Sequence, residues 1–306
     1  MENRIVFMGT PDFAVPSLVA LTEDFQVVGV VTQPDRPSGR GRKMIPSAIK
    51  LAAEELGLEV IQPENANEKE SLEKIKNWNP DLICVAAYGQ IIKPIILNLP
   101  QYGCINVHAS LLPRWRGASP INAAILHGDS QTGVTIMKMG PGLDDGPILA
   151  QESLDILRED TAGSLSDRLA DLGGNLLIAT IPPYIESKIN PSTQDSTLVT
   201  YALQLKKSAG ELDFELKAES LARKIRAYSP WPGTYTFWNE VRLIIHQARA
   251  VLVTSPGPGV LTVYEGCPAI GTSSGVLVLD LLQLAGKKKV TGPDFLNGNP
   301  DWEITE

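Results

Sequence analysis

Short apolar runs alternate with amphipathic segments through the first half of the sequence, and this alternation constrains the fold more than any other feature. Strands are predicted at 4–9, 25–32, 81–87, 104–108, 134–139 and 148–154, and helices at 15–22, 46–57 and 162–181. Strands that alternate with helices at this spacing are typical of a doubly wound, mostly parallel sheet. We therefore expect a Rossmann-like α/β domain over residues 1–189.

The ligand of this sheet is not expected to be a dinucleotide. The first strand ends in Gly9-Thr10-Pro11 without the G-x-G-x-x-G fingerprint, and the sequence contains no P-loop. We therefore predict no nicotinamide cofactor. Because ligands of open α/β sheets bind beyond the carboxyl ends of the strands, the residues just after Gly9, Ala87 and Val107 should meet in one cleft.

A change in composition separates a second domain from the first. Residues 190–206 contain several Ser and Thr residues without a helical stripe, and they are predicted to form a linker. A predicted helix at 217–228 precedes predicted strands at 234–238, 241–253, 259–264 and 275–284. Several short strands with one helix favour a small OB-like β-barrel over residues 207–306. Trp231 and Trp238 are expected in its core.

Composition and charge narrow the class of protein. The 306 residues, 43% of them hydrophobic and 20% charged, suit two globular domains. No apolar run reaches the ~18 residues of a membrane span, and the start of the sequence leaves no room for a signal peptide. Three scattered cysteines suit neither a disulfide framework nor a metal cluster, so we expect a cytoplasmic protein without a metal. The net charge of −8 arises before residue 206 and argues against a nonspecific nucleic-acid coat.

Three polar residue types point to acyl transfer between two nitrogens. Asn106 and His108 are two residues apart on a predicted strand, so their side chains face the same side. Asp144 and Asp145 lie in the glycine-rich segment 139–147. An amide can donate to the oxyanion of the attacked carbonyl, an imidazole can move the proton, and a carboxylate can orient the imidazole. The structural alternatives are a histidine that caps a loop and acidic residues that form a turn.

At these residues the sequence resembles the folate-dependent formyltransferases. The motifs are Asn106-x-His108, Ser110-Leu-Leu-Pro-Arg-Trp-Arg-Gly117, Gly142-Leu-Asp144, the opening Phe7-Met-Gly-Thr-Pro-Asp-Phe-Ala-Val-Pro16, Ser229-Pro-Trp-Pro-Gly233 and Asp294-Phe-Leu-Asn-Gly298. The resemblance implies that Asn106, His108 and Asp144 are catalytic and that 10-formyltetrahydrofolate is the formyl donor. It also implies that two segments hold the pterin, with the residues Ala87, Tyr88, Gly89, Gln90, Ile91, Ser110, Leu111, Leu112, Pro113 and Gly117.

The resemblance is greatest to the formyltransferases that act on aminoacylated tRNA. It implies that the acceptor is methionine esterified to initiator tRNA, that the product serves translation initiation, and that the protein is a monomer. The segment 33–47 is long for a connection between a strand and a helix, and the resemblance implies that it enters the acceptor stem, with Arg42 the residue that matches most directly. The expected substrate contacts are Gly9, Thr10, Pro11, Phe13, Arg36, Arg40, Arg42, Lys43, Lys206, Lys207, Arg223, Lys287 and Lys288.

Other readings remain open at this point. A disordered surface loop and solvated lysines would account for the same basic residues. Asp145 stands where family members commonly carry Thr, and two carboxylates would repel each other if both were buried. One alternative function is a formyltransferase or formyl hydrolase for a small molecule, which would not explain the basic segment or the second domain. Another is a catalytically inactive protein that binds tRNA, which the intact Asn106, His108 and Asp144 disfavour.

Overall fold

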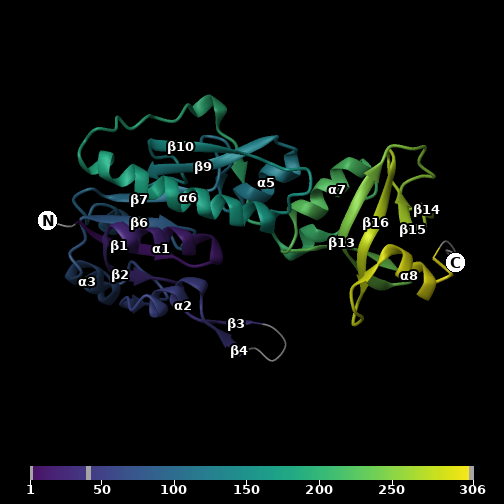
Figure 1. Cartoon of the computed structure of the whole chain (residues 1–306), viewed down its shortest axis with the longest axis horizontal. Coiled ribbons are helices and arrows are strands. Elements are labelled where there is room, and N and C mark those ends of the chain that lie inside the picture. The colour runs from purple at the N-terminus through teal and green to yellow at the C-terminus, as the bar shows by residue number, and fades with distance from the viewer. Residues whose placement is uncertain (1–2, 39–42, 303–306) are drawn as a thin grey trace. The chain divides into compact units, whose positions relative to one another are not determined.

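The structure, a computed structural model, describes residues 3–38 and 43–302. Its contacts divide the chain into two compact units (Figure 1). The first unit comprises Met1–Pro120, Gln131–Asp155 and Ser166–Tyr201, and the second comprises Ile121–Ser130, Ile156–Leu165 and Ala202–Glu306. Two short segments of the predicted first domain, 121–130 and 156–165, thus belong to the second unit.

A seven-stranded sheet forms the centre of the first unit, in the order β10-β9-β7-β6-β1-β2-β5. Its strands are β1 (Arg4–Gly9), β2 (Gln26–Val31), β5 (Val60–Ile61), β6 (Leu82–Ala86), β7 (Cys104–His108), β9 (Gln131–Lys138) and β10 (Ile148–Asp155). The five strands from β5 to β7 run parallel, while β9 and β10 add an antiparallel pair beside β7. The expected doubly wound, mostly parallel sheet is confirmed.

Helices connect and cover these strands (Figure 1). They are α1 (Val15–Asp24), α2 (Ala48–Glu55), α3 (Lys69–Asn77), α4 (Pro94–Leu97) and α6 (Ala162–Ile185), whereas α5 (Pro120–His127) belongs almost entirely to the second unit. The long helix α6 lies close to the sheet because it has glycine where it meets β7. A Cβ at Gly173 would come within 2.8 Å of a methyl carbon of Val107. The helix α3 was not anticipated, since only Leu72 and Ile75 of this charged segment are buried.

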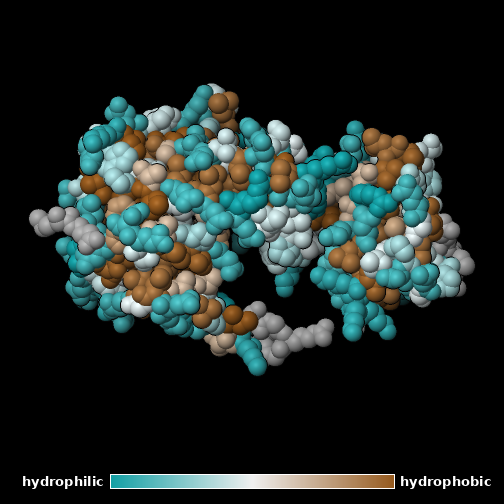
Figure 2. All heavy atoms as spheres, in the orientation of Figure 1, coloured by the Kyte–Doolittle hydropathy of each residue, from teal (hydrophilic) through white to brown (hydrophobic). Residues whose placement is uncertain are grey.

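The basic segment 33–47 contains two short strands where the sequence suggested only a loop. β3 (Arg36–Ser38) pairs antiparallel with β4 (Lys43–Ile45), with Arg36 opposite Ile45. Met44 and Ile45 are exposed, and Figure 2 shows apolar side chains on the surface of this hairpin. The backbone hydrogen bonds of this hairpin therefore form with little apolar burial, which is why hydropathy did not indicate it.

The second unit is built on an antiparallel six-stranded sheet in the order β12-β13-β16-β15-β14, with β17 paired to β16. Its elements are α7 (Ala218–Ala227), β12 (Thr234–Trp238), β13 (Val241–Val251), β14 (Leu261–Tyr264), β15 (Cys267–Gly271), β16 (Val276–Leu284), β17 (Val290–Thr291) and α8 (Gly292–Gly298). The ring of Trp238 lies 5.5 Å from Phe295 and 5.7 Å from Trp302 in the core. The expectation that Trp231 is also buried is wrong, because it is 50% exposed in the turn that follows α7.

The segment between the two predicted domains is ordered by hydrogen bonds rather than by apolar burial. It contains the 3-10 helix η2 (Ser196–Leu198) and the short strand β11 (Tyr201–Ala202), and the 3-10 helix η3 (Lys207–Gly210) follows it. β11 pairs with β8 (Arg116–Gly117), so the segment returns to the loop that follows β7. Among residues 3–38 and 43–302, no helix has the length and apolarity needed to cross a bilayer.

Candidate active site

The loops that follow β1, β2 and β6 meet at the carboxyl edge of the parallel strands. The Thr10 hydroxyl donates a hydrogen bond of 2.9 Å to the Tyr88 carbonyl, and the Gln33 amide donates one of 3.2 Å to the same oxygen. The convergence expected of the residues after Gly9 and Ala87 is confirmed, and the loop after Val107 starts at the same edge because β7 runs parallel to β6. Gly9 has a packing role here, because a Cβ on it would lie 3.0 Å from the Ala86 carbonyl oxygen. Pro11 and Phe13 follow in the turn that leads into α1, at the same edge.

Asn106 and His108 lie on β7, one pleat apart. Asn106 is flanked in register by Val85 of β6 and Met137 of β9, and His108 is paired with Thr135 of β9. Both side chains therefore belong to a central strand that has neighbours on each side. A polar pair at this place in an otherwise apolar strand is held in position by the whole sheet.

The His108 ring is almost completely buried and lies between two oxygen atoms. It is 5% exposed. Its Nε2 lies 3.0 Å from the Trp115 carbonyl oxygen, and its Nδ1 lies 3.7 Å from Oδ2 of Asp144. A carbonyl oxygen only accepts, so Nε2 must carry the proton of the neutral ring. Nδ1 is then free to take up a proton, and the Asp144 carboxylate is close enough to stabilise the resulting imidazolium.

Asp144 is oriented by the loop that carries it and by the backbone of Gly117. The loop connects β9 to β10, and Asp144 adopts a φ of +47°, a conformation that Asp tolerates better than most residues. The Gly117 N–H donates a 2.8 Å hydrogen bond to Oδ2, the oxygen that faces His108. The Asp144 side chain is only 19% exposed. The structure thus brings together Asp144 and His108, two of the three residues that the sequence singled out.

Asp145 lies apart from this arrangement. Its residue is exposed, and its carboxylate folds back over the loop, where a Cβ at Gly140 would lie 3.1 Å from its Oδ1. The two neighbouring carboxylates are therefore not buried together, and the condition under which they would repel each other is not met.

The segment 110–117 uses its polar groups to hold its own shape. The Ser110 hydroxyl donates to the Arg114 carbonyl at 2.6 Å, and the Thr135 hydroxyl donates to the Ser110 carbonyl at 2.6 Å. Leu112 N–H donates to the Thr135 hydroxyl, and Leu112 is buried. Ser110 is thus engaged structurally. Burial also raises the pKa of the Cys104 thiol to about 12, so neither side chain is poised as a nucleophile.

The second expected pterin segment, 87–91, presents its backbone and one apolar side chain. Ala87 and Gly89 have φ values of +46° and +85°, which turn the chain sharply after β6. The Tyr88 ring packs in the hydrophobic core, where burial raises the pKa of its hydroxyl. Gln90 donates to the Pro63 carbonyl and accepts from the Ala66 N–H. Ile91, by contrast, is 83% exposed.

Most of the basic residues expected to contact tRNA are exposed. Arg36 forms an exposed ion pair of 3.1 Å with Glu64. Arg40 and Arg42 lie outside the described residues. All five lysines of the predicted tRNA contacts are exposed: Lys43, Lys206, Lys207, Lys287 and Lys288.

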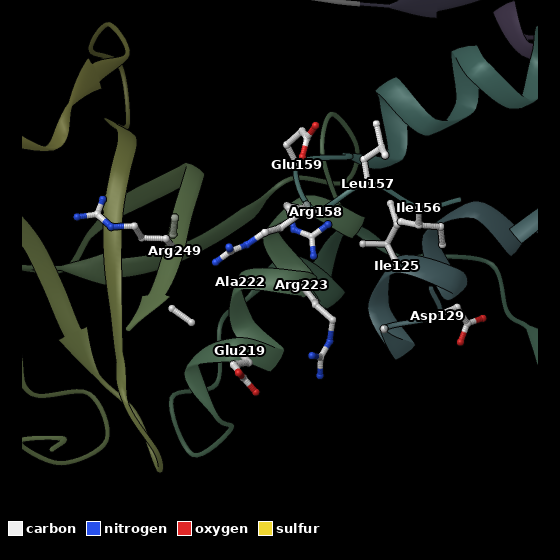
Figure 3. Close-up of a pocket in the computed structure, with 14 residues that line it drawn as sticks. Ile125, Asp129, Ile156, Leu157, Arg158, Glu159, Glu219, Ala222, Arg223 and Arg249 are labelled. Carbon is white, nitrogen blue, oxygen red and sulfur yellow. The ribbon is translucent and has the colours of Figure 1, made fainter. Parts of the chain in front are cut away.

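Arg223 lines a cavity of about 640 Å³ within the second unit (Figure 3). Arg158 from the turn before α6, Arg223 of α7 and Arg249 of β13 line it, but the Arg249 guanidinium points away, toward its ion-pair partners Asp280 and Glu265. Among the described residues, the buried Nε of Arg223 has no hydrogen-bond partner. Burial lowers the pKa of Arg226, and the nearby guanidinium of Arg223 lowers it further. Arg226 also lines this cavity, together with Asp129, Glu159 and Glu219, so the formal charge of the lining is only weakly positive.

Two residues of the structure support the site although the sequence did not single them out. The Gln194 amide hydrogen-bonds to the carbonyls of Asp144 and Gly146, and the Thr200 hydroxyl accepts from the Trp115 N–H. Both lie in the predicted linker. Side chains that bind backbone groups leave no periodic pattern in a sequence, so composition could not have revealed them.

Comparisons with known proteins identify relatives over almost the whole chain. Residues 3–181 match the formyl transferase family, and residues 204–300 match the formyl transferase C-terminal domain. The methionyl-tRNA formyltransferase of Halorhodospira halophila is 47% identical over 301 residues, which cover 97% of each chain. That of Marinobacter nauticus is 43% identical over 298 residues, covering 96% of each. A solved N-formyltransferase from Helicobacter canadensis, in complex with folinic acid and dTDP-3-aminofucose, has a TM-score of 0.65 and 18% identity, with 91% of this chain and 99% of that chain covered.

Proposed function

The chain belongs to the formyl transferase family, and we propose that it transfers a formyl group to the α-amino group of methionyl initiator tRNA, for translation initiation. Two curated relatives that act on methionyl-tRNA match nearly the full length of the chain at more than 40% identity. The match includes the second unit, but so does the match to the Helicobacter canadensis enzyme that holds dTDP-3-aminofucose. The acceptor is therefore proposed from the high identity with these two relatives and not from the presence of the second unit.

We propose 10-formyltetrahydrofolate as the formyl donor. The similar structure from Helicobacter canadensis holds folinic acid, a formylated folate, which supports this class of donor. The residues available to bind the pterin are the backbone of 87–91, the exposed Ile91 and the segment 110–117 with its buried Leu112. The pterin is a flat heteroaromatic ring with hydrogen-bonding edges. Apolar side chains can pack against the face of such a ring, and backbone groups can bind its edges.

The observation that carries the proposed mechanism is the placement of His108 between the Trp115 carbonyl and Asp144. The methionyl amine attacks the formyl carbon, and the carbonyl oxygen gains a negative charge that the Asn106 amide stabilises as a hydrogen-bond donor. His108 takes the proton from the attacking nitrogen at Nδ1 and returns a proton to N10 of the folate as the bond from that nitrogen to the formyl carbon breaks. The Asp144 carboxylate stabilises the intermediate imidazolium.

We propose a division of labour along the chain. Residues 1–189 carry out the transfer, 190–206 connect the domains and also contact the catalytic loops, and 207–306 bind the tRNA, with the protein acting as a monomer. Arg36, Lys43, Lys206, Lys207, Arg223, Lys287 and Lys288 are proposed to neutralise phosphates, together with Arg40 and Arg42. Such contacts need charge more than fixed geometry, which suits exposed side chains.

The donor can be tested by following its formyl group. The protein is incubated with methionyl initiator tRNA and 10-formyltetrahydrofolate labelled in the formyl carbon, and the amino acid is released from the tRNA by mild base. We expect the label on the methionine nitrogen, with one tetrahydrofolate formed for each formyl group transferred. Label recovered as free formate would instead indicate a hydrolase, and no consumption of the donor would indicate a tRNA-binding protein without this activity.

A further inference from the structure

The segment that follows α6 contacts the active site at two places, although its sequence suggested a linker. Gln194 is 8% exposed and buried among the loops of the first unit. Its Nε2 donates to the Asp144 carbonyl at 2.8 Å and to the Gly146 carbonyl at 2.7 Å. Its Oε1 accepts from Nε and Nη2 of Arg116, at 3.0 and 2.7 Å. A primary amide has two donor hydrogens and two acceptor lone pairs, so Gln194 uses its complete hydrogen-bonding capacity here.

These bonds hold the backbone on which the Asp144 carboxylate depends. Asp144 has a left-handed φ of +47°, which a residue other than glycine keeps only when its surroundings impose it. Gln194 binds the carbonyl of Asp144 itself and that of Gly146, so the turn is held on both sides of Asp145. The direction in which the Asp144 carboxylate points at His108 is therefore coupled to this one amide.

Thr200 holds the opposite side of the imidazole. Its hydroxyl accepts a 2.9 Å hydrogen bond from the Trp115 N–H, and its carbonyl accepts one of 2.9 Å from the Arg116 N–H. Trp115 also has a left-handed φ, of +61°, and its carbonyl is the acceptor for Nε2 of His108. The position of that carbonyl decides which ring nitrogen carries the proton.

We infer that Gln194 and Thr200 are positioning residues for the transfer: Gln194 aims Asp144 at Nδ1 of His108, and Thr200 fixes the carbonyl that keeps the proton on Nε2. The inference rests on the proposed roles of His108 and Asp144. Both nitrogens of the imidazole thus face groups held by one segment, and the predicted linker is part of the active-site framework. Neither residue touches a reacting atom in this account.

Two matched pairs of variants test the inference. Gln194→Glu keeps the size of the side chain and an acceptor for Arg116, but it turns an oxygen toward two carbonyls. Gln204→Glu makes the same change at an exposed position of the same segment. Thr200→Val keeps the shape and loses the acceptor, Thr193→Val makes that change at an exposed threonine, and Thr200→Ser restores the hydroxyl.

The kinetic readout is the separation of kcat from KM. Small displacements of a catalytic group reduce the rate by up to ~10²-fold, so we expect Gln194→Glu and Thr200→Val to lower kcat by about 10- to 100-fold. KM for the tRNA and for the donor should stay unchanged, and Gln204→Glu, Thr193→Val and Thr200→Ser should behave like the wild type. An increase in KM with kcat preserved would overturn the inference.

The second readout is nitrogen NMR of the imidazole rings, which does not depend on activity. The chain contains three histidines, so His127 and His246 serve as internal controls in the same spectrum. We expect the neutral His108 ring to carry its proton on Nε2, and Thr200→Val to mix the two tautomers while Thr200→Ser does not. Unchanged His108 signals in Thr200→Val would overturn the inference.

The two readouts separate this inference from the proposed function. If the wild type transfers no formyl group but His108 responds to Thr200→Val as described, the proposed function fails and the positioning role stands. If transfer occurs and neither kcat nor the His108 signals respond, only the positioning role fails. If Gln194→Glu does not fold, as judged by the His127 and His246 signals, the three threonine variants decide the question.

Discussion

The protein holds its proposed catalytic groups in place by hydrogen bonds, whereas it leaves most of its proposed tRNA contacts exposed. Each nitrogen of His108 lies beside an oxygen whose own backbone is hydrogen-bonded, and Asp144 is held by the Gly117 N–H. Lys206, Lys207 and Lys287 are exposed at the surface. Acid–base chemistry requires fixed distances, whereas attraction to phosphates requires charge within reach. The predictions below test whether this difference in support corresponds to a difference in function.

The largest effect should come from the imidazole. His108→Ala removes the group that accepts and returns the proton, and loss of one acid–base group costs about 10²–10⁴ in rate. Single-turnover formylation with saturating tRNA measures this step. His127→Ala is the matched control, because His127 bonds the Ala123 carbonyl within the second unit. Turnover of His108→Ala within tenfold of the wild type, with tRNA affinity unchanged, would show that His108 is not the acid–base group.

The next effect should come from the oxyanion donor. Asn106→Ala should lower kcat by about 10²–10³, as removal of an oxyanion-hole donor does. KM for both substrates should change little, because the amide acts on charge that develops only in the transition state. Steady-state kinetics over both substrate concentrations separates the two parameters. A higher KM with normal kcat would show that Asn106 binds substrate and does not stabilise the oxyanion.

Arg42 tests the residues that are proposed to bind the tRNA. Arg42→Ala should lower kcat/KM for methionyl-tRNA by about tenfold, the order expected for one nucleic-acid contact. Slow hydrolysis of the folate donor in the absence of tRNA should be unaffected, and it serves as the internal control. Equal losses in both reactions would assign Arg42 to the folate site instead.

A smaller, salt-dependent effect is expected from Lys206 and Lys207, at the end of the predicted linker. The double variant Lys206→Ala/Lys207→Ala should weaken tRNA binding moderately and reduce the salt dependence by about one unit for each phosphate that is no longer neutralised. The control is Lys69→Ala/Lys76→Ala, which removes two exposed lysines at α3. Binding titrations at several salt concentrations measure the slope. Equal slopes in both double variants would show that Lys206 and Lys207 contribute only general charge.

Asp145→Thr should have the smallest effect. The Asp145 carboxylate is exposed and folds over Gly140, away from the buried His108 and Asp144 pair. We expect kcat to stay within about twofold, since exposed substitutions remote from such features change free energies by only ~0.5 kcal/mol. A larger gain in kcat from Asp145→Thr would show that the second carboxylate restrains the active site.

The sequence was informative wherever a residue acts through a regular pattern. The parallel strands appear as buried runs, and Asn106 and His108 are visible because polar residues interrupt one of them. The hairpin β3–β4 was missed, since its exposed strands bury almost nothing. Trp231 was misplaced because an aromatic residue next to two prolines gives no sign of whether its turn is covered.

Gln194 and Thr200 show a second limit. Their partners are backbone groups of Asp144, Gly146 and Trp115, more than 45 residues away in the sequence. Every residue offers a backbone carbonyl whatever its side chain is, and all but proline offer an N–H. No sequence motif could therefore connect Gln194 and Thr200 with these distant partners. The segment lacks apolar periodicity for the same reason, and its order became visible only through hydrogen bonds.

The central claim is that the first unit transfers a formyl group to an amine which the tRNA delivers. The most direct test compares formylation of methionyl initiator tRNA, methionyl elongator tRNA and free methionine, with 10-formyltetrahydrofolate as the donor. We predict rapid formylation of the initiator, slow formylation of the elongator and none of free methionine. Formylation of free methionine at the rate of the initiator tRNA, or of neither tRNA while the folate is consumed, would contradict it.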